Sequence, residues 1–481
     1  MRASSVVALA SLLALAQRPA FSAARCAARA GAWVPLSARG APAVSVETPV
    51  VKIGKRIFVF GASGAIFDPC ANRWSAMSRA GLPDDAWSAR HSGALVVGDR
   101  VVFVGVGNNG EVPFATSGVT ALVYDVARNR WSTVPDQPTA FAWRRAAMIV
   151  ATDREVIVWG GVVEANPGRG GRARLLDDGA RLDPVAGTWR PTSRTNAPSG
   201  RSYARGVWTG TRLVVWGGIG TQTNPYQCGM GGECLPTGGG GVYDPASDTW
   251  TTMSAAGAPA ARRGAAVKRV GDAVLVWGGV DHPDGALYDP GANTWRPLPP
   301  SPPAIAGARL DDFAVTVGAG KFVVVTNRQQ AAVYDLASAG WTAVPDASFP
   351  VGLKDLRDLG GGALQLIVDH RQQGVPGTGT LARVDAQAAR WAFAPLPPQN
   401  APTSLESGIV AWTDDQLIVW GPRYQQVRYE ADRTHPKGCG GPREPGQPIC
   451  DPVVPVREVR IGRGGQEGGL FRPVFTAAPS R

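Results

Sequence analysis

The chain has 481 residues, of which 44% are hydrophobic and 18% charged, and its 61 Gly and 40 Pro are many for a helical protein. Its 16 Trp, with no 18-residue apolar run after the first twenty residues, exclude a disordered chain, a coiled coil and a membrane bundle. The net charge of +11 comes mainly from Arg residues placed singly or in pairs, whereas nucleic-acid-binding proteins concentrate them in a stripe or tail. We therefore expect no nucleic-acid partner, while an anionic ligand stays open.

The first residues have the pattern of an export signal. Arg2 gives a positive start, an apolar stretch follows over 6–16, and small-residue cleavage sites come after it. The stretch is too short for a membrane anchor, and an Arg directly before Cys26 argues against a lipoprotein. We predict a signal peptide over 1–24, a chain that does not span a membrane, and a secreted or periplasmic location.

A repeat runs through the rest of the chain. Seven times an Asp is followed by a Trp six positions later, in phrases such as VYDPASDTW and ALYDPGANTW. The pairs are Asp68/Trp74, Asp125/Trp131, Asp183/Trp189, Asp244/Trp250, Asp289/Trp295, Asp335/Trp341 and Asp385/Trp391. Upstream lie short β-branched runs, most of which end in Gly, at 57–61, 101–105, 156–161, 213–218, 274–279, 322–327, 364–369 and 417–421.

Each repeat unit indicates four short strands separated by turn residues. A Gly pair after the β-branched run lets the backbone leave the sheet with positive φ. The Asp is suited to accept hydrogen bonds from amides of the following turn, and the Trp to pack between neighbouring sheets. One four-stranded sheet cannot bury both faces alone, so the units are expected to stack radially into an all-β propeller.

This pattern over roughly residues 30–430 resembles the kelch-repeat family, which includes the propeller of galactose oxidase. The motif content (hydrophobic strand with Gly-Gly, then Tyr-Asp, then Trp) is specific when it is repeated this often. The copper site of galactose oxidase needs paired Tyr and His ligands, but the repeat itself uses Tyr124, Tyr243, Tyr288 and Tyr334. That departure puts a copper oxidase in doubt, and we expect no cofactor and no metal.

The motifs predict eight four-stranded blades, with seven as the fallback if one weak unit is degenerate. Eight β-branched runs are present, but the last has no following Trp. We expect the N-terminal strand with Trp33 to complete this blade, because WVPLSARGAPA (33–43) matches WTTMSAAGAPA (250–260). Tyr429 and Glu430 are assigned to the Tyr-Asp position of the same blade. The propeller is therefore predicted over 25–435.

Six cysteines fit an oxidising compartment, where an even number is expected. Cys228 with Cys234 and Cys439 with Cys450 each bracket a Gly-rich loop and are interpreted as local disulfides, which leaves Cys26 and Cys70 as the third pair. A metal site is the alternative, but no His stands at ligand spacing from any Cys. The segment 436–481 is predicted as a Gly-, Pro- and Arg-rich tail that either packs across the closing blade or is flexible.

Arginines recur near the start of the innermost strand. Counting fifteen residues back from the Gly that ends a β-branched run reaches Arg90, Arg145 and Arg263, with Arg201 one position away and Arg309 near the same place. The resemblance implies that such arginines face the mouth of the central channel, where a basic ring suits a carboxylate or another anion. The alternative is that they bond neighbouring blade backbones and only organise the channel.

Two hypotheses about function follow. The first is an exported, monomeric propeller that binds a protein, a peptide or a glycan through its loop-rich face, with Trp87 and Trp143 either stacking on the ligand or capping a blade edge. The second is an envelope enzyme for carbohydrates, such as a sugar oxidase or a mutarotase-like isomerase. The four His residues are scattered and no catalytic residue is assigned, which favours the first hypothesis.

Overall fold

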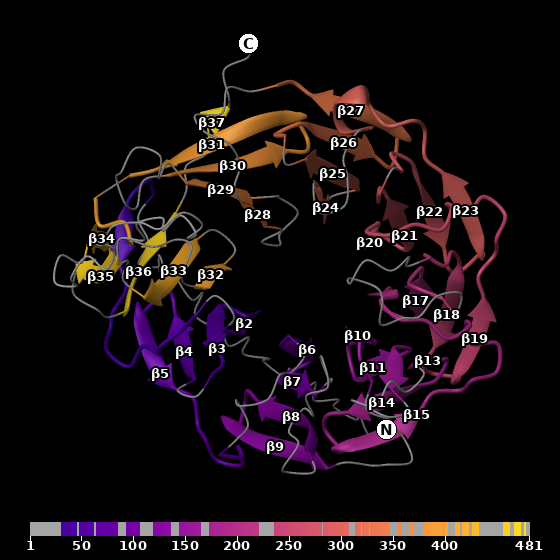
Figure 1. The fold of residues 1–481 in the computed structure, drawn as a ribbon, viewed down its shortest axis with the longest axis horizontal. Coiled ribbons are helices and arrows are strands. Elements are labelled where there is room, and N and C mark those ends of the chain that lie inside the picture. The colour runs from indigo at the N-terminus through magenta and orange to yellow at the C-terminus, as the bar shows by residue number, and fades with distance from the viewer. Residues whose placement is uncertain are drawn as a thin grey trace, which may run out of the picture.

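The computed structural model of the chain is a ring of radial sheets, built almost wholly from strands (Figure 1). It describes residues 30–45, 48–61, 64–84, 93–105, 119–135, 144–164, 173–220, 235–280, 282–306, 313–318, 320–326, 328–346, 355–357, 365–369, 379–397, 399–402, 409–413, 416–422, 426–431, 456–461, 466–472 and 476–477. Within these residues, seven sheets have four strands, one has five, and two strand pairs stand apart. The predicted all-β propeller fold is confirmed, and its predicted number of blades agrees with these eight larger sheets.

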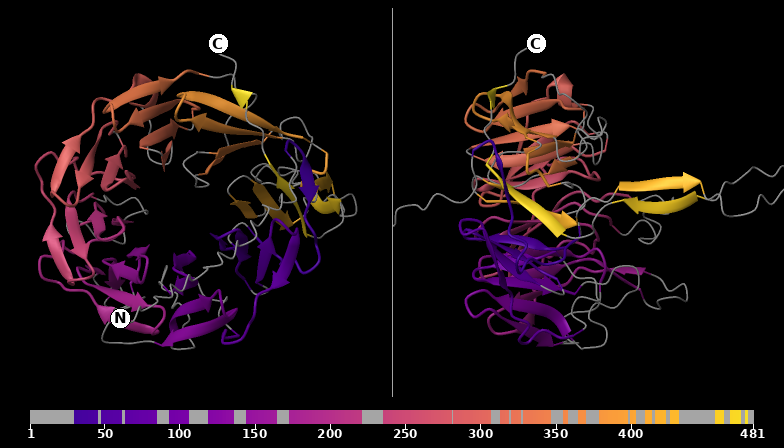
Figure 2. Two further views of the ribbon diagram at one scale, coloured as in Figure 1. Left: turned by 180° about the vertical axis from the view of Figure 1, so that it is seen from behind. Right: turned by 90° about the vertical axis from the view of Figure 1, so that its left-hand side faces the viewer.

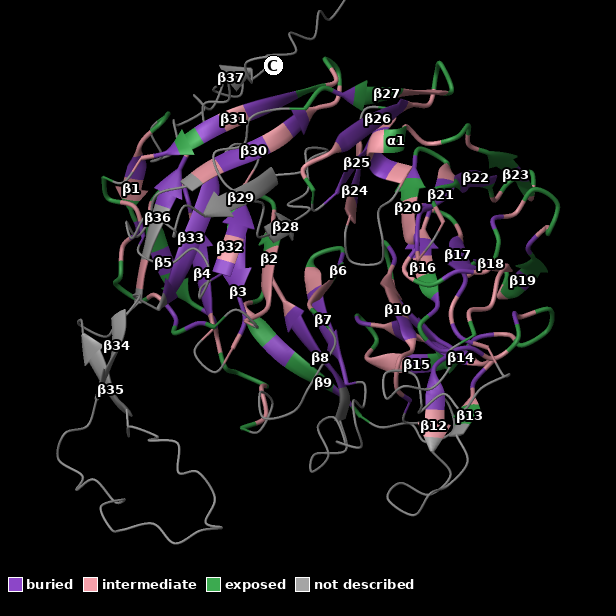
Figure 3. Ribbon diagram, turned by 45° about the horizontal axis from the view of Figure 1, so that its top comes forward, coloured by how far each residue is buried: buried purple, intermediate pink, exposed green. Residues whose placement is uncertain are grey.

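We number the blades 1 to 8 in chain order by their innermost strands. These innermost strands are β2 (Val50–Ile53), β6 (Leu95–Val97), β10 (Met148–Ala151), β16 (Arg205–Trp208), β20 (Ala266–Val270), β24 (Phe313–Gly318), β28 (Asp355–Arg357) and β32 (Ile409–Trp412). The second strands carry the β-branched runs: β3 (Arg56–Val59), β7 (Arg100–Val104), β11 (Val156–Trp159), β17 (Leu213–Trp216), β21 (Ala273–Trp277), β25 (Lys321–Thr326), β29 (Gln365–Asp369) and β33 (Leu417–Pro422). The second strands of blades 1 to 6 and of blade 8 are among the most buried in the ring (Figure 3).

The outer half of blades 1 to 7 carries the Asp and Trp of the repeat, and blade 8 has the Trp (Trp33) without the Asp. The third strands are β4 (Ala65–Asp68), β8 (Val119–Asp125), β14 (Gly179–Asp183), β18 (Gly240–Asp244), β22 (Gly285–Asp289), β26 (Ala331–Asp335), β30 (Gly379–Asp385) and β36 (Gln466–Phe471). The fourth strands are β5 (Arg73–Ala76), β9 (Arg130–Pro135), β15 (Thr188–Pro191), β19 (Thr249–Thr252), β23 (Thr294–Pro297), β27 (Gly340–Val344), β31 (Arg390–Leu396) and β1 (Trp33–Pro35). A short helix, α1 (Pro303–Ala306), precedes blade 6.

The Asp of the repeat stands at the end of the third strand and orders the turn that follows. In blade 5, Asp289 Oδ1 accepts hydrogen bonds from the amides of Gly291 at 2.8 Å and Ala292 at 3.0 Å. Equivalent carboxylate–amide bonds form at Asp68, Asp125, Asp183, Asp244, Asp335 and Asp385. The predicted role of the Asp in the turn is therefore confirmed.

The Trp of the fourth strand joins its blade to the preceding one. In blade 5, Trp295 Nε1 donates to the carbonyl of Ser254, just after blade 4, at 2.9 Å. The Ser254 amide donates to Asn293 Oδ1 at 2.8 Å, and the Tyr288 hydroxyl donates to the same oxygen at 2.7 Å. Equivalent indole–carbonyl bonds form at Trp131, Trp250 and Trp341. Stability is therefore spread over contacts between neighbouring blades, as in other repeat proteins.

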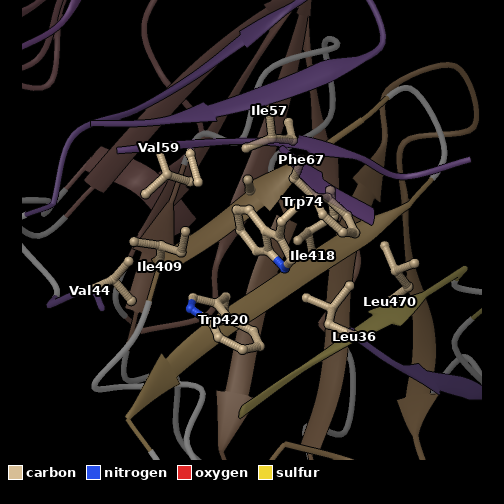
Figure 4. Packing of buried hydrophobic residues seen from close by; sticks show 12 residues of the cluster. Leu36, Val44, Ile57, Val59, Phe67, Trp74, Ile409, Ile418, Trp420 and Leu470 are labelled. Atoms are coloured by element: carbon tan, nitrogen blue, oxygen red, sulfur yellow. The ribbon is translucent and has the colours of Figure 1, made fainter. Parts of the chain in front are cut away.

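The N-terminal strand closes the ring, as predicted. β1 pairs with β36 in the sheet order β1-β36-β33-β32, so Trp33 lies in the outermost strand of blade 8. The interface between blades 8 and 1 is a buried apolar cluster in which Trp420 faces Trp74 with ring centroids 5.5 Å apart (Figure 4). Leu36 and Leu470 cover its outer side (Figure 4). The N-terminal strand β1 and the C-terminal strand β36 thus meet in blade 8 through the hydrogen bonds of their antiparallel pairing.

The predicted third strand of blade 8 is wrong. Tyr429 and Glu430 lie in β34 (Gln426–Ala431), which pairs only with β35 (Val456–Ile461). The third strand is β36, where Phe471 pairs with Trp33 just as Tyr288 pairs with Trp295 in blade 5. The physical reason is that β36 supplies an aromatic residue opposite Trp33, with ring centroids 5.1 Å apart, after an insertion between the second and third strands.

Two strands near the C-terminal end, β36 and β37, are part of the propeller. β36 comes from the segment predicted as a tail, and β37 (Thr476–Ala477) pairs with β31 as a fifth strand of blade 7. The predicted boundary at residue 435 therefore falls inside blade 8 instead of after it. These two strands pair within blades 7 and 8, and the choice between packing and flexibility for the rest of the segment stays a prediction.

The export signal over 1–24 lies outside the described residues and stays a prediction. In the part of the chain that the structure describes, no helix is long and apolar enough to cross a membrane. Cys70 is disulfide-bonded. Its partner and the other predicted disulfides, from Cys26, Cys228, Cys234, Cys439 and Cys450, fall outside the described residues, so all three pairings stay predictions.

Candidate functional site

Insertions between second and third strands mark one end of the ring. Antiparallel strands alternate in direction, so these connections and the links between blades share an end, which we call the loop-bearing face. In blade 3 the insertion contains the pair β12 (Val162–Glu164) and β13 (Ala173–Leu175), and in blade 8 it contains β34 and β35. The β34–β35 pair projects well beyond the ring (Figure 2). The insertion in blade 8 was not predicted, because residues 423–435 were assigned to its third strand.

The Gly pairs turn the chain out of the second strands at this face. In blades 3, 4 and 5 both glycines have positive φ, and the second of each pair reaches 96° at Gly161, 104° at Gly218 and 116° at Gly279. A Cβ at Gly218 would stand 2.7 Å from the carbonyl oxygen of Ser202, so no side chain fits there. The predicted reason for the Gly pair is therefore confirmed.

One buried arginine per blade lies under each of these Gly turns, sixteen residues before the first Gly. The three residues are Arg144, Arg201 and Arg262, with 2%, 4% and 3% of their surface exposed. Their Nη1 groups donate to the carbonyls of Gly160 at 3.0 Å, Gly217 at 3.1 Å and Gly278 at 3.4 Å. Each also donates to the carbonyl of the residue before the third strand, Asp178, Gly239 or Asp284. These bonds organise the backbone, as the alternative interpretation expected.

The predicted arginine ring differs from this row. The spacing of fifteen residues selects Arg145 and Arg263, the second member of each Arg pair, of which Arg145 is half-buried and Arg263 is exposed. Of the predicted residues, only Arg201 belongs to the buried row. Arg90, Arg309, Trp87 and Trp143 lie outside the described residues. The structure thus separates a structural row from exposed arginines beside it, and a ligand-binding role for any of them stays a prediction.

Acidic residues accompany two of the three buried arginines. Arg262 donates to the carboxylate of Asp284 with both terminal guanidinium nitrogens, at 2.8 Å for Nη1 and 3.0 Å for Nη2. Arg144 Nη2 lies 3.0 Å from a carboxylate oxygen of Asp178. In blade 4 the residue directly before the third strand is Gly239 instead of Asp. Arg201 pairs with no carboxylate among the described residues.

We predict a pH-dependent stability from the Asp284 pair. The hydrogen bond from Arg262 holds the pKa of Asp284 below its ordinary value. A carboxylate with a depressed folded-state pKa stabilises the fold above its unfolded-state pKa, and this stability is lost as the pH falls through the folded-state value. Asp284→Asn should lower the free energy of unfolding at pH 7 by about 1 kcal/mol, since the carboxylate is largely exposed, and have little effect near pH 2.

Urea unfolding of the parent and of Asp284→Asn over pH 2–7 measures this difference. Asp272→Asn, at an exposed turn on the opposite end of the ring, is the control and should leave the pH profile unchanged. A constant difference between parent and Asp284→Asn at all pH values would contradict the role of the charge.

The backbone next to Arg201 is strained. Tyr203 has φ 55° and is 60% exposed, while the equivalent residues are Ala146 in blade 3 and Gly264 in blade 5. A bulky residue rarely adopts positive φ, and such strain tends to occur at functional sites. Between Arg201 and Tyr203, Ser202 is buried, and its hydroxyl has no hydrogen-bond partner among the described residues. Sequence reasoning missed both residues, because nothing in RSYARG shows which residue takes the left-handed conformation.

A small hollow of about 240 Å³ lies elsewhere. Its lining comes from the turns between first and second strands and after the third strand of blades 4 and 5, and includes Arg212, Asp272 and Asp289. These turns are at the opposite end from the loop-bearing face. No group of three or more His, Cys, Asp or Glu residues that could hold a metal occurs in the described ranges.

Comparison with known proteins agrees with the repeat. No family model matches the chain. A curated F-box/kelch-repeat protein of Arabidopsis thaliana is 29% identical over 133 residues, which are 28% of this chain and 28% of that protein. Among solved structures, the structure of YjhT matches with a TM-score of 0.38 and 14% identity, covering 61% of this chain and 94% of that one. The repeated motif has a fixed place in blade after blade of this β-propeller, and the partial match to a kelch-repeat protein supports its resemblance to the kelch-repeat family.

Proposed function

We propose that the protein is an exported binding module for a protein, a peptide or a glycan, and that its ligand contacts come from the loop-bearing face. The observation that supports this most is that the described insertions, β12–β13 and β34–β35, lie between second and third strands and so belong to one end of the ring. Loops and insertions on a rigid scaffold are where binding residues concentrate. The exposed Tyr203 and Leu235 lie at the same end.

A peptide and glycan array, followed by hydrogen exchange with the strongest ligand, tests the proposal. Protection should appear at 160–164, 201–205 and 217–220, and the turns around residues 154 and 271 at the opposite end should exchange at their free rate. Protection confined to the opposite end, no binding on the array, or turnover of a sugar with stoichiometric metal would contradict it. The last result would support the carbohydrate-active enzyme instead.

A charge-reversed pair of variants gives a matched control. Arg174 in β13 and Arg269 in β20 are both exposed, at opposite ends of the ring. Arg174→Glu should weaken binding of an anionic ligand, because it reverses a charge at the loop-bearing face, and Arg269→Glu should leave it unchanged.

A further inference from the structure

The three buried arginines differ in one respect that points to a ligand. In blade 5, Arg262 Nη2 donates to Asp284 Oδ2 at 3.0 Å, and in blade 3 the carboxylate of Asp178 stands 3.0 Å from Arg144 Nη2. In blade 4, Arg201 Nη2 donates to the Ser199 hydroxyl at 3.1 Å. The second N–H of Arg201 Nη2 has no acceptor among the described residues. The Nη1 bonds of Arg201 to backbone carbonyls nevertheless match those of Arg144 and Arg262.

The position of the missing carboxylate is open. Gly239 stands where the other blades have Asp178 and Asp284, and its carbonyl accepts from the amide of Gly217 just as theirs accept from Gly160 and Gly278. A Cβ built on Gly239 would meet nothing within 4 Å. Blade 4 therefore keeps the arginine and its hydrogen bonds to the backbone, but the residue before its third strand has no acidic side chain to pair with Arg201.

We propose that Arg201 binds a carboxylate of an acidic peptide at the loop-bearing end of blade 4. This deepens the proposed function and rests on it. The carboxylate would take the place that Asp284 has beside Arg262 in blade 5. Charge-assisted hydrogen bonds of this kind are among the strongest that a protein makes with a ligand.

The electrostatics agree with this assignment. Burial lowers the pKa of Arg201 to about 10, and no acidic group of the described residues offsets this loss of hydration. A buried charge without an opposite charge is costly, so a carboxylate from outside would regain interaction energy that blades 3 and 5 obtain from their own chain. The net charge of +11 favours the approach of an acidic ligand.

Apolar residues next to Arg201 favour a peptide over an acidic sugar. Ile219 pairs with Ser202 on one side and with Pro236 on the other, so the chain at Tyr203 and the chain at Leu235 border the same short ladder. Tyr203 is 60% exposed and Leu235 is 44% exposed. Exposed Tyr is typical of peptide and protein interfaces, and an aliphatic side chain offers nothing to the hydroxyls of a sugar.

Gly239→Asp tests the open position without knowledge of the natural ligand. Asp tolerates positive φ better than most residues, and Gly187→Asp is the matched control because Gly239 and Gly187 have φ 63° and 65° and both face open space. If the new carboxylate reaches Arg201, Gly239→Asp should unfold at a higher temperature than Gly187→Asp. If Gly239→Asp unfolds at the same temperature as Gly187→Asp or at a lower one, the inference that a carboxylate can pair with Arg201 at this position is wrong.

A random-peptide array, probed with the intact chain and these two variants, tests the ligand. We expect the bound peptides to share an Asp or Glu. Gly239→Asp should lower the affinity for these peptides about tenfold or more, and Gly187→Asp should leave it unchanged. Replacing the acidic residue of the peptide by Asn or Gln should lower the affinity by a similar factor. If the bound peptides lack an acidic residue, or if both variants bind them equally well, the carboxylate site at Arg201 is wrong, but the proposed function as a binding module still stands. Selection of acidic glycans alone also overturns it, and no binding at all removes both proposals.

Tyr203→Gly provides a second variant that separates binding from folding. Blade 5 has a glycine at this position, so Tyr203→Gly should release the backbone strain and raise the unfolding temperature. It should also lower the affinity for the peptides selected by the array. Ala146→Gly releases similar strain in blade 3, where φ is 49°, and should leave peptide binding unchanged. Unchanged binding in Tyr203→Gly would contradict a ligand at blade 4.

Discussion

Trp420→Ala should lower the free energy of unfolding by about 3–5 kcal/mol, the cost expected for truncating a fully buried Trp. Trp420 is 1% exposed at the interface between blades 8 and 1, and its indole Nε1 donates to the Pro42 carbonyl at 2.8 Å. Its ring also faces Trp74. The truncation therefore removes packing from the junction where the two ends of the ring meet, and urea or thermal unfolding measures the loss.

Two further variants separate the causes. Trp420→Phe keeps most of the packing but loses the bond to Pro42, so we expect a cost of about 1–3 kcal/mol. Trp341→Ala removes the fourth-strand Trp of blade 6, which is only half-buried, and it should cost less than Trp420→Ala. If both Ala variants lose the same stability, the closing interface is no more important than any other contact between blades.

The propeller fold could be predicted from the sequence because the residues of the repeat act on the chain next to them. An Asp that orders its own turn, a Gly pair with positive φ and a Trp six residues after the Asp can be recognised without knowing the partner strand. Blade 8 is different, because its third strand follows an insertion and its fourth strand comes from the other end of the chain. RYQQVRYEAD resembles a third strand more closely than GGLFR does, but Phe471 is the residue that pairs with Trp33.

The candidate site was less predictable than the fold. In the pairs Arg144-Arg145 and Arg262-Arg263, the two residues are identical in type, and only the three-dimensional structure shows that the first is buried. The importance of Gly239 appears only when the position before the third strand is compared among blades with known register. Neither the missing carboxylate nor the left-handed conformation of Tyr203 leaves a pattern in one sequence.

Gly218→Ala is expected to destabilise the protein by about 3 kcal/mol or more, because two effects act together. The residue has φ 104°, a conformation that essentially only Gly adopts, and the new Cβ would stand 2.7 Å from the carbonyl oxygen of Ser202 and 3.1 Å from the amide nitrogen of Ala204. Both neighbours are backbone atoms, so the start of blade 4 has to move. Thermal and urea unfolding measure the effect.

Gly187→Ala is the control, because Gly187 has φ 65° and its Cβ would face open space, so only the conformational cost of about 1–2 kcal/mol applies. A similar loss in both variants would mean that the backbone at Ser202 yields easily. If instead Gly218→Ala costs more, the Gly pair holds Ser202 and Tyr203 in place next to Arg201. Partial recovery of stability in the double variant Gly218→Ala/Tyr203→Gly would then show that the second glycine of the motif and the strained Tyr are coupled through this backbone.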